Sequence, residues 1–174
     1  MLRRLRRRAF DISESLVIET HQPTETRQWG ERLGRALRPG DVVALIGDLG
    51  TGKTTLTQGI AQGLGIDASS VTSPSFVLMK EYRAGRIPLY HIDVYRLDGV
   101  PEMQRMGYED YLTPQSVAVI EWAQKLGSIL PSEHLAVELE HADESVRRVT
   151  IRAVGAKYDA LIQQLKQTSS ATSR

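Results

Sequence analysis

The chain has 174 residues, of which 25% are charged, a net charge of +1 and no cysteine. The length suits one globular domain, and the lack of cysteine excludes a disulfide scaffold, a structural zinc finger and a thiol nucleophile. Five arginines lie between positions 3 and 8; without them 17 basic residues face 21 acidic ones, a net charge of −4, which argues against a domain that coats nucleic acid.

The two ends of the chain differ from its middle. MLRRLRRRAF is basic but is not followed by the apolar stretch of a secretory signal. Residues 1–12 are therefore expected to be a disordered basic head, the alternative being an arm for nucleic acid or membrane. Residues 167–174 are expected to be a disordered tail, which leaves a single domain over residues 13–166. No apolar run is long enough to span a membrane, so we expect a cytoplasmic protein.

The first part of the domain alternates strand and helix patterns. Residues 14–20 (ESLVIET) predict a strand. Apolar residues at helical spacing predict a helix over residues 23–38, which Pro39 and the following glycine stop. Residues 41–46 are almost entirely apolar, as in a strand buried on both faces. A glycine-rich loop and a helix ending at Gly65 follow.

The middle of the domain predicts shorter elements. Residues 76–82 and 87–94 resemble two strands joined by the short turn 83–86. Residues 101–112 predict one or two short helices, and residues 117–120 another buried strand.

The last part predicts a hairpin and a helix. Residues 135–140 and 149–153 alternate apolar and polar side chains on either side of a turn at 142–145, so glutamate and arginine are able to face each other. Apolar residues between 158 and 165 mark the final helix. The whole order predicts an α/β three-layer P-loop NTPase fold with a mixed, mostly parallel central sheet and an antiparallel C-terminal hairpin.

A phosphate-binding loop carries the strongest chemical signal. Residues 47–54 (GDLGTGKT) match G-x-x-x-x-G-K-[ST], directly after a buried strand and at the start of a helix. Backbone amides of such a loop and the helix N-terminus favour phosphate, while Lys53 reaches the β- and γ-phosphates and the Thr54 hydroxyl binds Mg²⁺. The predicted nucleotide-binding residues are Asp48, Leu49, Gly50, Thr51, Gly52, Lys53, Thr54 and Thr55.

A phosphate loop needs an acidic residue at the end of a neighbouring strand to hold Mg²⁺ and position water. Asp93 and Glu121 both lie at such positions, where α/β sheets bind their ligands. We assign Glu121 to the metal and Asp93 to orienting water or a metal-bound water, and the reverse assignment stays open. The predicted catalytic residues are Lys53, Asp93 and Glu121.

Six further residues are candidates for a switch or a supporting role: Thr72, Ser73, Ser75, His91, Arg96 and Trp122. The three hydroxyls sense the γ-phosphate, as switch segments do, or simply form a turn. His91 is a core histidine or a base, and Arg96 pairs with a carboxylate or reaches a phosphate. Trp122 is a core residue, which we favour, or a wall of the site.

Four segments, GDLGTGKTT, TSPSF, HIDVYRL and IEW, occur in this order and together resemble the TsaE (YjeE) family. These are small bacterial ATPases of tRNA threonylcarbamoyladenosine biosynthesis, and the resemblance covers residues 14–165. It implies ATP and Mg²⁺ as ligands, Thr54 and Glu121 as metal ligands, and Asp93 as a catalytic or metal-linked acid. It also implies nucleotide contacts around residues 22–26 and near Ser145.

The resemblance further implies a complex with TsaD and TsaB that modifies adenosine 37 of tRNA. ATP hydrolysis would support turnover of that complex, and tRNA would be contacted indirectly, through the complex. The alternative is a small-molecule kinase, which needs a mobile arginine-rich lid for which Arg83 and Arg86 are the only candidates. The chain has no asparagine, so a guanine-reading Asn-Lys-x-Asp segment is excluded.

Overall fold

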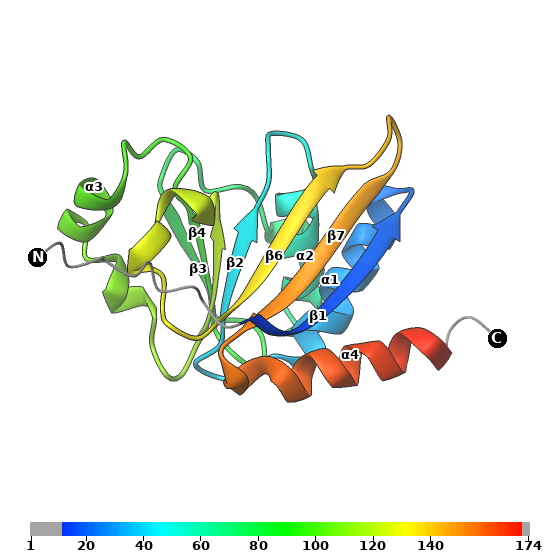
Figure 1. Ribbon diagram of the computed structural model, residues 1–174. Coiled ribbons are helices and arrows are strands. Elements are labelled where there is room, and N and C mark those ends of the chain that lie inside the picture. Colours follow the sequence, from blue (N-terminus) through cyan, green and yellow to red (C-terminus); the bar gives the residue numbers. More distant parts are fainter. Residues whose placement is uncertain (1–11, 172–174) are drawn as a thin grey trace, which may run out of the picture.

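The computed structural model describes residues 12–171, which form one seven-stranded sheet in the order β1-β7-β6-β2-β5-β4-β3 (Figure 1). Strands β6, β2, β5 and β4 run parallel, whereas β1–β7, β7–β6 and β4–β3 pair antiparallel. The predicted mixed sheet with a parallel centre is therefore confirmed. The strands are β1 (Ile12–Thr20), β2 (Val42–Ile46), β3 (Met79–Tyr82), β4 (Leu89–Asp93), β5 (Val117–Glu121), β6 (His134–His141) and β7 (Arg147–Val154).

Helices cover the two faces of the sheet unequally. The α-helices among the described residues are α1 (Pro23–Ala36), α2 (Lys53–Gly63), α3 (Val100–Arg105) and α4 (Asp159–Ala171). Val43 and Leu45 of β2 face a core built with α1, α2 and α4. Val42 and Ala44 face a second core with α3 and short 3₁₀ turns. This alternation along β2 produces the three layers, and no helix of residues 12–171 is long and apolar enough to cross a membrane.

Helices α1 and α2 cross in close contact because glycines face each other at the crossing. A Cβ atom on Gly59 would lie 2.0 Å from the carbonyl oxygen of Arg27, and one on Gly30 would lie 2.3 Å from that of Leu56. Only glycine allows this approach of two backbones. The contact brings the start of α1 beside the phosphate loop that precedes α2.

The segment before β3 departs from the prediction. A strand was expected from residue 76, but β3 begins at Met79 and residues 75–77 form a turn. The amide groups of Val77 and Leu78 donate to the carbonyl oxygen of Pro74 at 2.9 and 2.7 Å, and Leu78 has a φ of +66°. The turn leaves the Phe76 side chain 85% exposed, so its apolar character does not indicate a buried strand.

The ends of the domain also differ from expectation. Strand β1 begins at Ile12, the last residue assigned to the disordered head, and residues 1–11 lie outside the described part. Helix α4 continues to Ala171, so residues 167–171 are helical and the predicted tail began too early. The predicted short helices over 101–112 are confirmed as α3 and a 3₁₀ turn. Arg152 and Glu138 form the expected cross-strand ion pair at 2.6 Å.

Candidate nucleotide-binding site

The phosphate loop, residues 47–54, joins the carboxyl end of β2 to the start of α2. Gly50 and Gly52 have φ angles of +77° and +102°, which residues with side chains rarely adopt. These conformations turn the chain tightly enough for Lys53 to be the first residue of α2. The loop therefore has the conformation that the motif predicts, at the end of the sheet where it was expected.

Lys53 is held inside the loop. Its side chain is 95% buried, and Nζ donates to the carbonyl oxygens of Gly47 at 2.8 Å and Asp48 at 2.7 Å. Nζ also lies 4.0 Å from the centre of the Trp122 ring, a favourable cation–π distance. Burial lowers the pKa of Lys53, and the opposing influence comes from the carboxylates of Glu121, Asp93 and Asp48.

Thr54 and Glu121 form the polar pair expected of a magnesium site. The Thr54 hydroxyl donates to Glu121 Oε1 at 3.0 Å and Oε2 at 3.2 Å, and Glu121 is buried at the end of β5. Both are hard oxygen ligands, which suit Mg²⁺. Residues 12–171 contain no group of three or more His, Cys, Asp or Glu residues that could hold a metal ion.

Asp93 is occupied by protein donors. Its Oδ2 accepts hydrogen bonds from the hydroxyls of Ser73 at 2.9 Å and Ser75 at 2.6 Å, and its Oδ1 accepts from the amide of Tyr95 at 2.9 Å. Thr72, the third predicted switch hydroxyl, is bonded to side chains of β3 instead. Asp93 thus anchors the segment that contains Ser73 and Ser75, and the structure separates Thr72 from it.

A cavity of about 470 Å³ opens between the loop, this serine segment and the ends of β4 and β5. Trp122 is half-buried with a φ of +62°, packs against the second hydrophobic core and also lines this cavity, so the core position that we favoured and the wall position each describe it in part. The Arg96 guanidinium lies 4.2 Å from the centre of the Phe76 ring. Of the predicted site residues, the cavity brings together Leu49, Gly50, Gly52, Lys53, Thr54, Thr55, Ser73, Ser75, Asp93, Arg96, Glu121 and Trp122.

His91 lies beneath this cavity. It is fully buried in β4, and its Nε2 lies 2.8 Å from Glu121 Oε1. Asp48 does not line the cavity: it borders a groove on the other side of the loop with Glu138 and Glu140.

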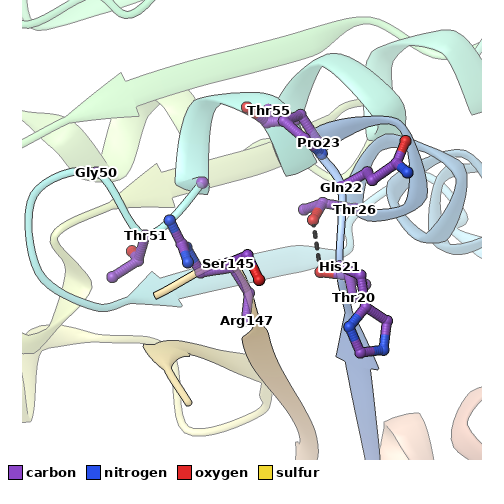
Figure 2. Close-up of a pocket in the computed structure, with 11 residues that line it drawn as sticks. Thr20, His21, Gln22, Pro23, Thr26, Gly50, Thr51, Thr55, Ser145 and Arg147 are labelled. Carbon is purple, nitrogen blue, oxygen red and sulfur yellow. Dashed lines mark hydrogen bonds between the residues drawn. The ribbon is translucent and has the colours of Figure 1, made fainter. Parts of the chain in front are cut away.

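A second, smaller cavity of about 130 Å³ adjoins the loop (Figure 2). The start of α1 forms one side of it, and the β6–β7 hairpin forms the other. Thr20 and Thr26 share a hydrogen bond of 2.8 Å between their hydroxyls, and Ser145 and Arg147 lie opposite, with the Arg147 guanidinium extending toward Thr51. Residues 22–26 and Ser145, indicated by resemblance alone, are therefore brought together here.

Thr20 and Arg147 were missed from the sequence. They are register partners of β1 and β7, so only knowledge of the strand order places them beside the loop. Neither residue belongs to a motif. The carboxyl ends of β1 and β2 and the β6–β7 turn all lie at the upper end of the sheet in Figure 1, which is why both cavities meet at one loop.

Comparison with known proteins identifies the family of this chain. The family model for "Threonylcarbamoyl adenosine biosynthesis protein TsaE" matches residues 20–149. A protein of Bacillus subtilis named "tRNA threonylcarbamoyladenosine biosynthesis protein TsaE" is 41% identical over 154 residues, which cover 88% of this chain and 96% of the relative. A protein of the same name from Treponema pallidum is 39% identical over 127 residues, covering 73% and 93%.

A solved structure is similar over the same range. The crystal structure of YdiB from Bacillus subtilis has a TM-score of 0.75 and 38% sequence identity to this chain, with 90% of this chain and 97% of YdiB covered. The sequence matches and the shared fold therefore cover the same part of the chain. The chain therefore belongs to the TsaE family.

Proposed function

We propose that this chain is a magnesium-dependent ATPase subunit in the biosynthesis of threonylcarbamoyladenosine in tRNA. The observation that carries the proposal is the contact between Thr54 and Glu121 at 3.0 Å. These residues come from the phosphate loop and from a neighbouring parallel strand, which is where ATPases of this fold place the two groups that hold Mg²⁺.

We assign the residues around the larger cavity to three roles: binding the phosphates, holding Mg²⁺ and orienting water. Loop amides and the Lys53 ammonium bind the phosphates, and Thr54 and Glu121 would hold Mg²⁺. When bound, the ion would neutralise the charge that develops during phosphoryl transfer. Ser73 and Ser75 donate to Asp93 at the cavity wall, so a γ-phosphate competes with Asp93 for their hydroxyls. Asp93, once released, orients the attacking water.

The smaller cavity is assigned to the base and ribose of the nucleotide. It shares Gly50, Gly52 and Thr55 with the phosphate cavity, so one ligand can occupy both. Thr20, Thr26 and Arg147 supply hydroxyl oxygens and a planar cation, which suit hydrogen bonding to a ribose and stacking on a base.

Partner binding is supported by the apolar surface around the site. Of the large apolar side chains exposed within residues 12–171, all but Val17 lie near the larger cavity or the turn beside it: Leu49, Phe76, Val77, Tyr95 and Met106. Such clustering is typical of a protein-interaction surface. We propose that a TsaD–TsaB pair covers it, and that tRNA is contacted through that complex.

The kinase alternative is disfavoured, because both arginines that could form its mobile lid are engaged in other contacts. Arg83 pairs with Glu81 at 2.9 Å. Arg86 donates to the carbonyl oxygens of Gly34 and Leu37 at 2.6 and 2.9 Å, which closes the C-terminal end of α1. A phosphate-release assay with and without candidate small-molecule acceptors separates the two functions, because only a kinase transfers phosphate to the acceptor.

The metal assignment is tested with Glu121→Gln and Asp93→Asn. We expect Glu121→Gln to weaken Mg²⁺ binding and turnover while ATP binding in EDTA is kept, because the amide retains the shape but not the charge. We expect Asp93→Asn to lose turnover and keep metal affinity. If the effects on metal affinity are reversed, the two roles are swapped. If neither variant alters turnover, the proposed ATPase is wrong.

The partner assignment is tested by titrating a TsaD–TsaB pair with this chain in ATP, in ADP and without nucleotide. ATP should strengthen binding, because a γ-phosphate that withdraws Ser73 and Ser75 from Asp93 reorders the turn carrying Phe76. Equal affinity in all three states would remove the switch role of this segment.

A further inference from the structure

His91 has an environment that packing alone does not explain. It lies in β4 two residues before Asp93, is completely buried, and its Nε2 is 2.8 Å from Glu121 Oε1. Its other ring nitrogen, Nδ1, is buried and has no hydrogen-bond partner within residues 12–171. A buried nitrogen left unpaired costs free energy, so an apolar residue would suit this position better if it served only the core.

The direction of the hydrogen bond follows from the partner. An ionised carboxylate only accepts hydrogen bonds, so His91 Nε2 must carry the hydrogen and donate to Glu121. Glu121 Oε1 then accepts hydrogen bonds from both His91 and Thr54, and Glu121 Oε2 accepts only from the Thr54 hydroxyl, at 3.2 Å, among residues 12–171. The histidine fixes one oxygen of the carboxylate, and the other stays directed toward the loop.

We propose that His91 is a positioning residue that holds the Glu121 carboxylate in the orientation required to bind the divalent ion. This inference rests on the proposed function, because it assumes that Glu121 is a metal ligand. Hydrogen bonds to a ligating carboxylate fix its geometry, and their loss lowers metal affinity about 10–100-fold. The histidine itself touches neither nucleotide nor metal, so its removal leaves binding of metal-free nucleotide unchanged.

The test measures Mn²⁺ binding to the full chain in the presence of ADP, with free Mn²⁺ followed by electron paramagnetic resonance. His91→Phe, which removes the donor, is expected to weaken Mn²⁺ affinity about tenfold. His91→Gln, whose Nε2 donor reaches a similar point, is expected to stay within about threefold of the wild type, since one neutral hydrogen bond is retained. The affinity for ADP in EDTA is expected to be the same for the wild type, His91→Phe and His91→Gln.

His134→Gln is the matched control, because it also removes a buried histidine, which is the first residue of β6 and lies at the opposite end of the sheet. It should bind Mn²⁺ as the wild type does. Wild-type Mn²⁺ affinity in His91→Phe, or a loss in His91→Gln as large as in His91→Phe, would overturn the positioning role.

A measurement on the unaltered protein keeps the inference testable if His91→Phe does not fold. Long-range proton–nitrogen NMR of the metal-free chain is expected to show hydrogen on Nε2 of His91, and a ring protonated only on Nδ1 would refute the proposal.

Glu121→Gln separates a failure of the positioning role of His91 from a failure of the metal role of Glu121. If Glu121→Gln itself keeps wild-type Mn²⁺ affinity, the metal role of Glu121 fails; if Glu121→Gln weakens Mn²⁺ binding and His91→Phe does not, only this inference fails.

Discussion

Replacing Gly59 by alanine tests whether the α1–α2 contact controls both stability and nucleotide binding. The new Cβ would lie 2.0 Å from the carbonyl oxygen of Arg27 and 2.9 Å from Cα of Gly30. Both are backbone atoms of a helix, so they cannot rotate away and the helices must separate. Alanine gains about 1 kcal/mol of helix propensity over glycine. Overpacking costs about 1–3 kcal/mol, and a backbone clash belongs at the upper end. We expect a net loss of about 1–2 kcal/mol.

Thermal unfolding followed by circular dichroism measures this loss. A domain of this size loses about 2–4 °C per kcal/mol, so the melting temperature should fall by about 2–8 °C. ATP affinity should fall as well, because Thr26 of α1 and Gly52 at the start of α2 line the same cavity. Gln28→Ala, at an exposed position of α1, is the control and should stay within about 0.5 kcal/mol. A melting temperature of Gly59→Ala at or above that of the wild type would refute the reasoning.

Three further predictions concern other parts of the chain. Lys53→Ala should abolish ATP binding in calorimetry, because its ammonium is the only formal positive charge of the loop; unchanged affinity would contradict the phosphate-loop assignment. Deleting residues 1–10 should leave ATPase activity intact and the melting temperature within about 4 °C of the wild type, and a larger fall in melting temperature would show that the head is packed. The arginines of the head should give the isolated chain a weak, salt-sensitive affinity for tRNA, which the same deletion should abolish. Burial lowers the pKa of His134 below 6.5, so the unfolded chain binds more protons and stability falls as the pH drops through and below about 6.5. In His134→Gln the melting temperature should decline less between about pH 7.5 and about pH 5.5, and an equal decline would argue against this shift.

The sequence predicted the part of the site that depends on local patterns. A phosphate loop is encoded by adjacent residues, and Glu121 could be placed because strand ends meet at one edge of a parallel sheet. The hydrogen bonds of Asp93 were harder to predict, because its hydroxyl partners Ser73 and Ser75 lie 20 and 18 residues away along the chain. The two alternatives for Trp122 could not be separated, because its side chain both packs against the core and lines the cavity.

The smaller cavity, to which we assign the base and ribose, could not have been derived from local patterns. Thr26 and Arg147 come close only because β7 lies between β1 and β6, and strand order is a property of the whole sheet. The strand expected from residue 76 failed for a related reason. Phe76 has a side chain typical of strands, yet hydrogen bonds from Ser73 and Ser75 to Asp93 hold its neighbours in a turn.

The pairing of β1 with β7 has a consequence for the protein as it is synthesised. Thr26 and Arg147 both line the smaller cavity, and the second follows the first by 121 residues, which is about 6–24 s at ordinary rates of translation. During that time strand β1 has no partner, and unpaired strand edges are prone to aggregation. A ligand stabilises only the state that binds it. If ATP occupies this cavity as we propose, it cannot stabilise the nascent chain, and it protects the domain only after nearly the whole chain has left the ribosome.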